Sequence, residues 1–221
     1  MSDLKRQAAL AALAEIRDGM VVGLGSGSTA SIFIRELGQA GLKVLGIPTS
    51  EESRLIATEV GLPLTTFDEH PEIDVTVDGA DEVSPQLDLI KGLGGALVRE
   101  KIVAHASKRV VIIVDESKVV GRLGTKTVVP VEVIPLAVPL ILSELKDATL
   151  RKKNGKPFVS DNGNAILDWK SGVIEDPAAL EKQLKARTGV VDSGIFAGVA
   201  SSVIVAGQKF GIRHLNRAQS E

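Results

Sequence analysis

The sequence contains no cysteine, no tyrosine and only one tryptophan, and its charges nearly cancel. Without cysteine, disulfide bonds, thiolate zinc sites and cysteine nucleophiles are all excluded. The 26 Lys and Arg against 28 Asp and Glu leave a formal net charge of −2, and no basic run is longer than residues 151–153. Nucleic-acid binding requires a basic surface, and base stacking requires aromatic side chains, which here are five Phe and one Trp. We therefore expect no nucleic-acid partner.

Long apolar runs and clusters of metal ligands are missing as well. The longest uncharged stretches, residues 19–34 and 193–208, are rich in Gly and Ser and shorter than the ~20 apolar residues of a membrane-spanning helix. The three histidines, at positions 70, 105 and 214, have no ligand spacing. The sequence predicts no membrane partner, no metal and no organic cofactor.

The N-terminal segment resembles a secretory signal only faintly. Lys5-Arg6 precedes a short Ala-rich run, but charged residues return from Glu15 onward. An amphipathic helix closed by Gly19 is the better interpretation. We expect a cytoplasmic protein.

The first half of the chain alternates between β-branched runs and helical stretches. At 221 residues, with 44% apolar and 24% charged residues, the chain has the composition of a globular protein of one large or two modest domains. Strands are expected at residues 20–24, 42–47, 73–77 and 109–114, and helices at about 29–37, from 51 onward and at about 96–107. This alternation predicts a Rossmann-like α/β domain, in which helices cover a parallel sheet. The fourth strand is apolar throughout, which indicates burial on both faces.

The pattern changes after residue 125. Strand-like runs at 128–135, 148–153, 165–169 and 190–196 surround helical stretches at 135–146 and 177–187, and Asn154-Gly155 predicts a hairpin turn. The order β-α-β-β-α-β is that of a ferredoxin-like α+β domain. The apolar run at 200–207 then returns to the first sheet. We expect an α/β domain of residues 1–126 and 197–221, interrupted by a smaller α+β domain of residues 127–196.

A loop rich in Gly and Ser, GLGSGSTA at 23–30, joins the first strand to the next helix. Its glycines allow close approach of the backbone, and N–H groups at the helix start together with Ser26, Ser28 and Thr29 offer donors to an anion. The loop lacks the Gly-Lys-Ser/Thr of a P-loop and the last glycine of a dinucleotide fingerprint. It is either a phosphate-binding loop or simply a tight turn with a capped helix.

Two further motifs stand at strand ends. DGADEV at 78–83 follows the third strand, and ligands of open parallel sheets bind beyond the carboxyl ends of the strands. Asp78 and Asp81 are therefore candidates to bind sugar hydroxyls, although turn chemistry alone also explains an Asp-Gly pair. Lys118 follows the fourth strand and is either a solvated lysine or a cation for the phosphate.

The segment KGLGGALVREKIVAHAS at 91–107 is the most informative. Lys91 precedes a glycine-rich loop that opens a helix, and on that helix the neighbours of Glu100 on its own face are small or apolar, at positions 96, 97, 103 and 104. Arg99 and Lys101 diverge to the sides. Desolvation on such a face raises the pKa of a carboxyl group toward that of a useful general base. Together with a phosphate-binding loop, this set of residues suits proton transfer on a phosphorylated sugar.

These motifs resemble those of the type A ribose-5-phosphate isomerase family. The resemblance rests on GSGSTA, TVDGADEV, KGLGGAL-REKIVA, DESKVV, VEVIP and SDNGNAILD, which follow in order through nearly the whole chain. It implies interconversion of ribose 5-phosphate and ribulose 5-phosphate in the pentose phosphate pathway, without metal or organic cofactor. It also implies a homo-oligomer, for which we expect a homodimer, with a tetramer as the alternative.

The resemblance also implies roles for individual residues. Glu100 is the implied proton acceptor, with Asp81 and Lys91 as the other catalytic residues. The implied substrate-binding residues are Ser26, Gly27, Ser28, Thr29, Asp78, Gly79, Ala80, Asp81, Lys91, Gly92, Leu93, Gly94 and Lys118. The sequence departs from the family pattern at Leu93, where many members have a third consecutive glycine, so the backbone there and the direction of its N–H remain open.

The hypothetical mechanism starts with ring opening, assisted by Asp81 or Asp78. Glu100 then removes the proton from C2 to give a cis-enediolate and returns it to C1, while Lys91 and the N–H groups of the loop at 92–95 stabilise the oxyanion. Two other interpretations are a non-catalytic sugar-phosphate sensor and a coenzyme A transferase of related architecture. The sensor would need a DNA-binding module, and only about 19 residues precede the first strand.

Overall fold

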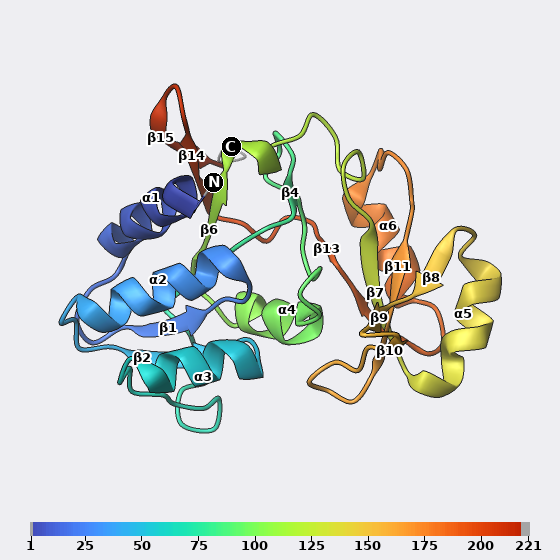
Figure 1. Ribbon diagram of the computed structural model, residues 1–221, viewed down its shortest axis with the longest axis horizontal. Coiled ribbons are helices and arrows are strands. Elements are labelled where there is room, and N and C mark those ends of the chain that lie inside the picture. The colour runs from blue at the N-terminus through green and yellow to red at the C-terminus, as the bar shows by residue number, and fades with distance from the viewer. Residues whose placement is uncertain (1, 218–221) are drawn as a thin grey trace.

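The structure, a computed structural model, describes residues 2–217 and has the two-part architecture that the sequence predicts. A six-stranded sheet has the strand order β15-β14-β6-β3-β1-β2, and all its neighbouring strands are parallel except the edge pair β14 and β15. Figure 1 shows this sheet and its helices as one lobe, with a smaller lobe beside it. The strands of the large sheet are β1 (Val21–Leu24), β2 (Leu45–Pro48), β3 (Val75–Asp78), β6 (Val110–Asp115), β14 (Ser202–Gly207) and β15 (Gly211–Asn216).

Two layers cover the large sheet. One face packs against three helices, α1 (Ser2–Ala12), α2 (Ser28–Gln39) and α3 (Glu51–Glu59). The other packs against α4 (Leu97–His105) and a three-stranded sheet of β13 (Ile195–Phe196), β5 (Leu89–Ile90) and β4 (Glu82–Val83). Val111 and Ile113 of β6 contribute to the first core, and Val110, Ile112 and Val114 to the second. Burial of this strand on both faces is confirmed.

The smaller lobe has the predicted ferredoxin-like topology. Its antiparallel sheet has the order β12-β7-β11-β8, and the chain runs β7, α5, β8, β11, α6, β12. Because each β-α-β unit leaves room for one strand between its ends, the first and third strands lie at the centre of the sheet. The elements are β7 (Val129–Val133), α5 (Val138–Glu144), β8 (Ala148–Leu150), β11 (Ala165–Trp169), α6 (Pro177–Lys185) and β12 (Val190–Ser193). We propose residues 127–196 as the inserted domain.

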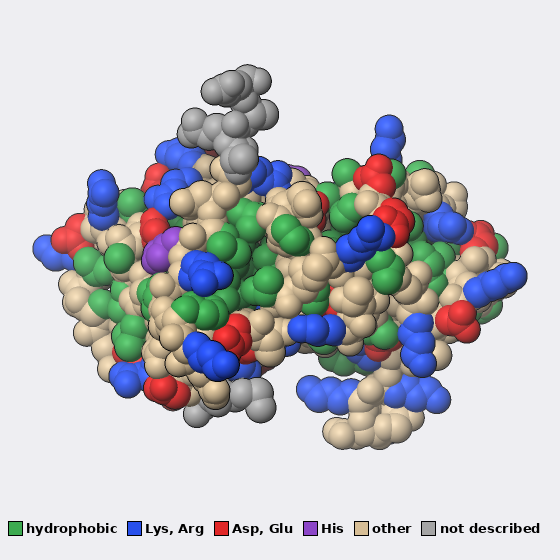
Figure 2. Space-filling view, turned by 90° about the horizontal axis from the view of Figure 1, so that it is seen from above, with side chains coloured by type: hydrophobic (Ala, Val, Ile, Leu, Met, Phe, Trp, Pro, Cys, Tyr) green, Lys and Arg blue, Asp and Glu red, His purple; other side chains and the backbone are tan. Residues whose placement is uncertain are grey.

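A two-stranded hairpin projects from this lobe. Strands β9 (Lys152–Lys153) and β10 (Lys156–Pro157) meet at Asn154-Gly155, both with positive φ, as the turn motif predicts. Lys152, Lys153 and Lys156 are all exposed, and Figure 2 shows a narrow projection at its lower edge that is flanked by Lys and Arg side chains.

Two predicted strands are broken by tertiary contacts. The run at 148–153 divides at Arg151, where the backbone changes partner: its N–H donates to Ile166 O at 2.8 Å, and its carbonyl accepts from Phe158 N at 2.9 Å. The run at 190–196 divides at Gly194, which donates its N–H to Pro130 O at 2.7 Å and accepts from Lys91 N at 2.8 Å. A Cβ at Gly194 would lie 2.2 Å from Lys91 O, so only glycine fits there. The chain therefore leaves the small sheet at Gly194 and enters the three-stranded one.

Three short helical turns complete the fold. They are η1 (Leu13–Glu15), η2 (Glu116–Lys118) and η3 (Pro135–Ala137). Strands β4, β5 and β15 have no counterpart in the sequence-based prediction. Within residues 2–217, no helix is both long and apolar enough to cross a membrane.

Candidate active site

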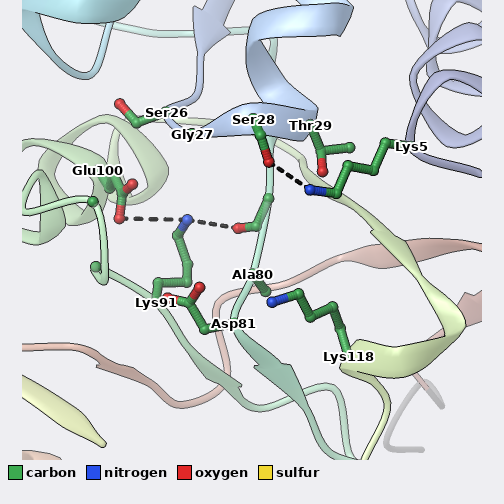
Figure 3. Close-up of a pocket in the computed structure, with 13 residues that line it drawn as sticks. Lys5, Ser26, Gly27, Ser28, Thr29, Ala80, Asp81, Lys91, Glu100 and Lys118 are labelled. Carbon is green, nitrogen blue, oxygen red and sulfur yellow. Dashed lines mark hydrogen bonds and ion pairs between the residues drawn. The ribbon is translucent and has the colours of Figure 1, made fainter. Parts of the chain in front are cut away.

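A pocket opens at the carboxyl ends of β1 and β3. From β1 the chain moves outward to β2, and then returns to the other side of β1 as β3, so the two strand ends form a topological switch point of the sheet. Figure 3 shows the pocket, with side chains converging from α1, α2, α4 and the loops after β3, β5 and β6. Its lining residues are Lys5, Ser26, Gly27, Ser28, Thr29, Gly79, Ala80, Asp81, Lys91, Gly92, Gly94, Glu100 and Lys118.

The loop after β1 wraps around the carboxylate of Asp78. Asp78 Oδ1 accepts from the N–H groups of Ser26 at 3.0 Å and Gly79 at 2.7 Å. Gly27 precedes α2 with a φ of 88°, a backbone conformation that favours glycine. The loop thus directs the first N–H groups of α2 toward the pocket, where an anion would be stabilised.

The hydroxyl groups of this loop divide between two tasks. Ser26 Oγ lies 2.7 Å from the hydroxyls of both Thr49 and Ser50 and so ties the loop to the end of β2. Ser28 Oγ instead accepts from Lys5 Nζ at 2.8 Å at the mouth of the pocket, as Figure 3 shows. Ser28 and Thr29 are therefore placed to meet a ligand, together with Lys5.

Three charged side chains meet at the bottom of the pocket. Lys91 Nζ lies 2.9 Å from Asp78 Oδ2 and 3.4 Å from Glu100 Oε2, and donates to Gly79 O at 2.7 Å. All three are buried, with Glu100 only 4% exposed. The apolar helix face predicted for Glu100 is confirmed. Glu100 Oε2 is buried, and its contact with Lys91 Nζ at 3.4 Å is a long ion pair, while the residue itself lines the pocket.

The burial of these charges changes their proton affinities. Burial raises the pKa of Glu100 to about 8, with Lys91 opposing the shift and Asp78 and Asp81 adding to it. Burial alone would lower the pKa of Lys91, but Asp78 and Glu100 outweigh it and hold that pKa above its ordinary value. The site therefore pairs a permanent cation with a carboxyl group that titrates near neutrality, a combination that suits general-base chemistry.

The remaining walls of the pocket are fixed by backbone contacts. Asp81 Oδ2 accepts from the N–H of Leu93 at 3.1 Å, which holds the glycine-rich loop against the strand end. Lys118 belongs to η2, and Lys126 Nζ donates to the carbonyls on either side of it, those of Ser117 and Val119. No group of three or more potential metal ligands occurs within residues 2–217.

Known proteins are similar to this chain in sequence and in fold. Residues 45–210 match the family described as ribose 5-phosphate isomerase A (phosphoriboisomerase A). The chain belongs to this family. It is 50% identical to ribose-5-phosphate isomerase A of Bradyrhizobium diazoefficiens, in an alignment covering 98% of this chain and 97% of the relative.

Solved structures agree with this assignment. A D-ribose-5-phosphate isomerase in complex with phospho-erythronic acid superposes with a TM-score of 0.93 at 42% identity, over 97% of this chain and 98% of the other. The ribose 5-phosphate isomerase A of Methanocaldococcus jannaschii gives 0.91 at 43%, with the same coverage.

The structure brings nearly all the predicted site residues to this one pocket. Asp78 and Leu93 are the exceptions. Asp78 lies behind Lys91, and Leu93 lies outside the lining, 41% exposed, with its N–H directed to Asp81. Lys5 lines the pocket but was not predicted as a site residue. Its position on α1 gives no local signal, because only the packing of α1 beside α2 brings it to Ser28.

Proposed function

We propose that the chain interconverts D-ribose 5-phosphate and D-ribulose 5-phosphate, with Glu100 as the base that moves the proton between C2 and C1. The observation that carries this proposal is the buried Glu100, which lines the bottom of the pocket beside the buried Lys91. The relatives are named for this isomerisation.

The phosphate of the substrate binds at the mouth of the pocket. Lys5 and Lys118 supply positive charge there, Ser28 and Thr29 supply hydroxyl donors, and the start of α2 supplies backbone N–H groups. When the phosphate is bound by these groups, C1 and C2 at the other end of the five-carbon chain lie toward Lys91 and Glu100. The solved relative that holds phospho-erythronic acid, a phosphorylated sugar acid, supports a ligand of this kind.

Ring opening falls to Asp81 rather than Asp78. Both oxygens of Asp78 are already engaged, by two N–H groups and by Lys91, and the residue does not line the pocket. Asp81 lines the pocket, and within the described part of the chain its carboxylate accepts one hydrogen bond, from the N–H of Leu93. It can therefore take the proton of the C1 hydroxyl and deliver it to the ring oxygen as the bond between C1 and that oxygen breaks.

The isomerisation itself transfers a proton across one carbon–carbon bond. Glu100 takes the proton from C2, the electron pair of that C–H bond forms the C1–C2 double bond, and negative charge develops on the carbonyl oxygen. Lys91 and the N–H groups of Gly92 and Gly94 stabilise that oxygen electrostatically, because the N–H groups of Leu93 and Gly95 already bind Asp81 and the carbonyl of Gly92. Glu100 returns its proton to C1, and the proton of the C2 hydroxyl passes to the oxygen on C1, so that the carbonyl moves from C1 to C2.

The setting of this activity is also part of the proposal. The product and substrate are phosphorylated metabolites, which favours a cytoplasmic protein. A homodimer is supported by apolar side chains exposed on the smaller lobe, since Leu136 is 91% exposed and Leu140 50%. Neither the family match nor the relatives support the sensor.

Proton NMR in deuterated water with EDTA tests the function directly. Purified protein and ribose 5-phosphate are expected to yield ribulose 5-phosphate, with deuterium entering at the exchanging carbon. Glu100→Gln, assayed in parallel at the same concentration of folded protein, is expected to lose both conversion and exchange. No conversion by the unaltered protein, combined with stabilisation of the fold by sugar phosphates, would instead favour a sensor.

A further inference from the structure

A second lysine is buried immediately beside the proposed base. Lys101 is 3% exposed, although the sequence predicted only that it diverges to the side of the helix face of Glu100. Its ammonium group contacts Glu181 Oε1 at 2.5 Å and Asp192 Oδ1 at 2.6 Å, and donates to the carbonyls of Ser193 at 2.9 Å and Ile195 at 2.8 Å. One side chain of α4 thus reaches both α6 and the chain segment that links β12 to β13.

The segment that Lys101 holds is also the one that positions Lys91. Gly194, between the two carbonyls bound by Lys101, accepts the backbone N–H of Lys91 at 2.8 Å. Strand β13 then pairs with β5, which directly precedes Lys91. Lys101 therefore touches the backbone that frames the cationic partner of Glu100.

The ring of Phe196 lies close to the ammonium groups of both Lys91 and Lys101. It is fully buried, with its centroid 4.7 Å from Lys101 Nζ and 5.5 Å from Lys91 Nζ. Both separations are within the range of a cation–π contact. A displacement of either ammonium group would disturb the packing of the ring against the other.

We propose that Lys101 is a positioning residue for the Lys91–Glu100 pair, because it fixes the helix that carries Glu100 and the segment that frames Lys91. The inference builds on the proposed function. Lys101 lies outside the residues that line the pocket and touches no substrate. It acts through the geometry of the pair, and specifically through the separation of 3.4 Å between Lys91 Nζ and Glu100 Oε2.

The two carboxylates that bind Lys101, those of Glu181 and Asp192, are balanced by Lys101 and Lys185. Asp192 also receives the exposed Lys185 at 3.1 Å and the N–H of Ser193. Burial would raise the pKa of Asp192, but Lys101 and these two donors hold it below its ordinary value. Removal of Lys101 alone leaves a buried carboxylate short of its main partner, and so α4 and the linking segment are expected to move apart.

Such a movement has different effects at the two ends of the pocket. Lys5, Ser28 and Lys118 belong to α1, α2 and η2. Within residues 2–217, Lys101 makes its hydrogen bonds and ion pairs with α6 and the segment from β12 to β13 and not with these elements, so phosphate binding should be retained. Glu100 faces Lys91, Asp78 and Asp81, of which only Lys91 lowers its pKa. A looser Lys91 therefore raises the pKa of Glu100 further and moves the acid limb of the kcat profile to higher pH.

The test compares Lys101→Met with Lys185→Met. Both variants remove an ammonium partner of the same carboxylate, but Lys185 is 62% exposed, and among residues 2–217 its side chain bonds to Asp192 alone. For Lys101→Met we expect kcat per folded molecule to fall at least thirtyfold and KM to change less than threefold. Its acid limb should move upward by at least half a pH unit. Lys185→Met should keep the kcat, KM and pH profile of the unaltered protein.

The other outcomes are equally decisive. A folded Lys101→Met with kcat within threefold of normal, or with an unmoved acid limb, would show that Lys101 serves stability alone. Equal losses in both variants would mean that the charge of Asp192 matters, and not the link to α4. If Lys101→Met does not fold, Glu181→Gln keeps both the lysine and the charge of Asp192 but weakens the hold on Lys101. It must then reproduce the kcat loss and the limb shift in smaller measure, and unchanged kinetics in this variant would overturn the proposal. Failure of the proposed function is seen separately, as no turnover by the unaltered protein.

Discussion

The two ends of the pocket are built in opposite ways. At the inner end, Asp78, Lys91 and Glu100 are buried and ion-paired before any ligand arrives. At the outer end, Lys5, Thr29 and Lys118 are half-buried and Ser28 is exposed. The inner end therefore acts through fixed charges in a medium of low polarity, where each interaction is strong, and the outer end acts through charges that water and salt weaken. Substitutions should separate the two ends by the kinetic constant that they change.

Glu100→Gln should have the largest effect. The amide keeps the shape of the side chain but cannot accept the proton, so kcat should fall by ~10²–10⁴ while KM stays within a few fold. The exposed Glu59→Gln, which makes the same chemical change on α3, should leave both constants unaltered. Steady-state kinetics with ribose 5-phosphate would decide the matter, and near-normal turnover by Glu100→Gln would remove this residue from the mechanism.

Lys91→Met should come next, with a loss of ~10²–10³ in kcat from the missing electrostatic stabilisation of the oxyanion. The change also leaves Asp78 and Glu100 buried without their shared cation, so the acid limb of the kcat profile should move upward. Lys209→Met, on the turn between β14 and β15, removes an exposed lysine as a control. A loss confined to KM would place Lys91 among the phosphate-binding residues instead.

The pH dependence of the unaltered protein follows from the same burial. Because the base must be ionised and the pKa of Glu100 is about 8, kcat/KM should rise roughly fiftyfold between pH 6 and pH 8, about double again, and level off above about pH 9. In the unfolded chain, Glu100 has its ordinary pKa of 4.5 and loses its proton above that pH, whereas in the folded protein it keeps the proton up to about pH 8. The free energy of unfolding should therefore decrease as pH rises from about 4.5 to 8.

Denaturant titrations across this range provide the measurement. Glu100→Gln carries no such proton, so its stability relative to the unaltered protein should grow with pH through the same window. A stability difference that does not change with pH would show that the carboxyl group of Glu100 is not destabilised by its burial.

Lys118→Gln tests the outer end and should have a smaller effect. A charged hydrogen bond to phosphate at a half-exposed site predicts a loss of about tenfold in kcat/KM, almost all of it in KM. The loss should shrink in high salt, because salt already screens this contact in the unaltered protein. Kinetics at two ionic strengths, with Lys209→Gln as the control, would reveal a kcat effect if Lys118 belongs instead to the inner end.

The sequence predicts the inner end better than the outer one because its signals are local. Glu100 was identified from the residues on its own helix face, Asp78 from its position at a strand end, and Lys91 from its place before a glycine-rich loop. These features depend on helix and strand periodicity, which neighbouring residues determine. The order of elements in both lobes was predictable for the same reason.

What the sequence did not show depends on contacts between distant segments. Lys5 reaches the pocket through the packing of α1 beside α2, and Lys101 is buried only because α6 and β12 bring two carboxylates to it. The run at 190–196 reads as one strand until Gly194 is drawn between Pro130 and Lys91. In each case the partner lies more than 20 residues away, beyond the reach of a local pattern.

Substitution of Leu93 should have the smallest effect, and it tests most directly which residues belong to the inner end of the pocket. The backbone φ of Leu93 is not positive, its side chain is 41% exposed, and its N–H already binds Asp81. Leu93→Gly should therefore change kcat/KM less than about threefold and lower the free energy of unfolding by up to about 1 kcal/mol, through the added freedom of the unfolded chain. Gly92→Ala is the contrasting variant, since Gly92 has a φ of 93° and a Cβ there would lie 2.6 Å from that of Leu97. If Leu93→Gly cost as much activity as Gly92→Ala, the loop would need the leucine side chain itself, and the inner end would include that side chain as well as the buried charges and the loop backbone.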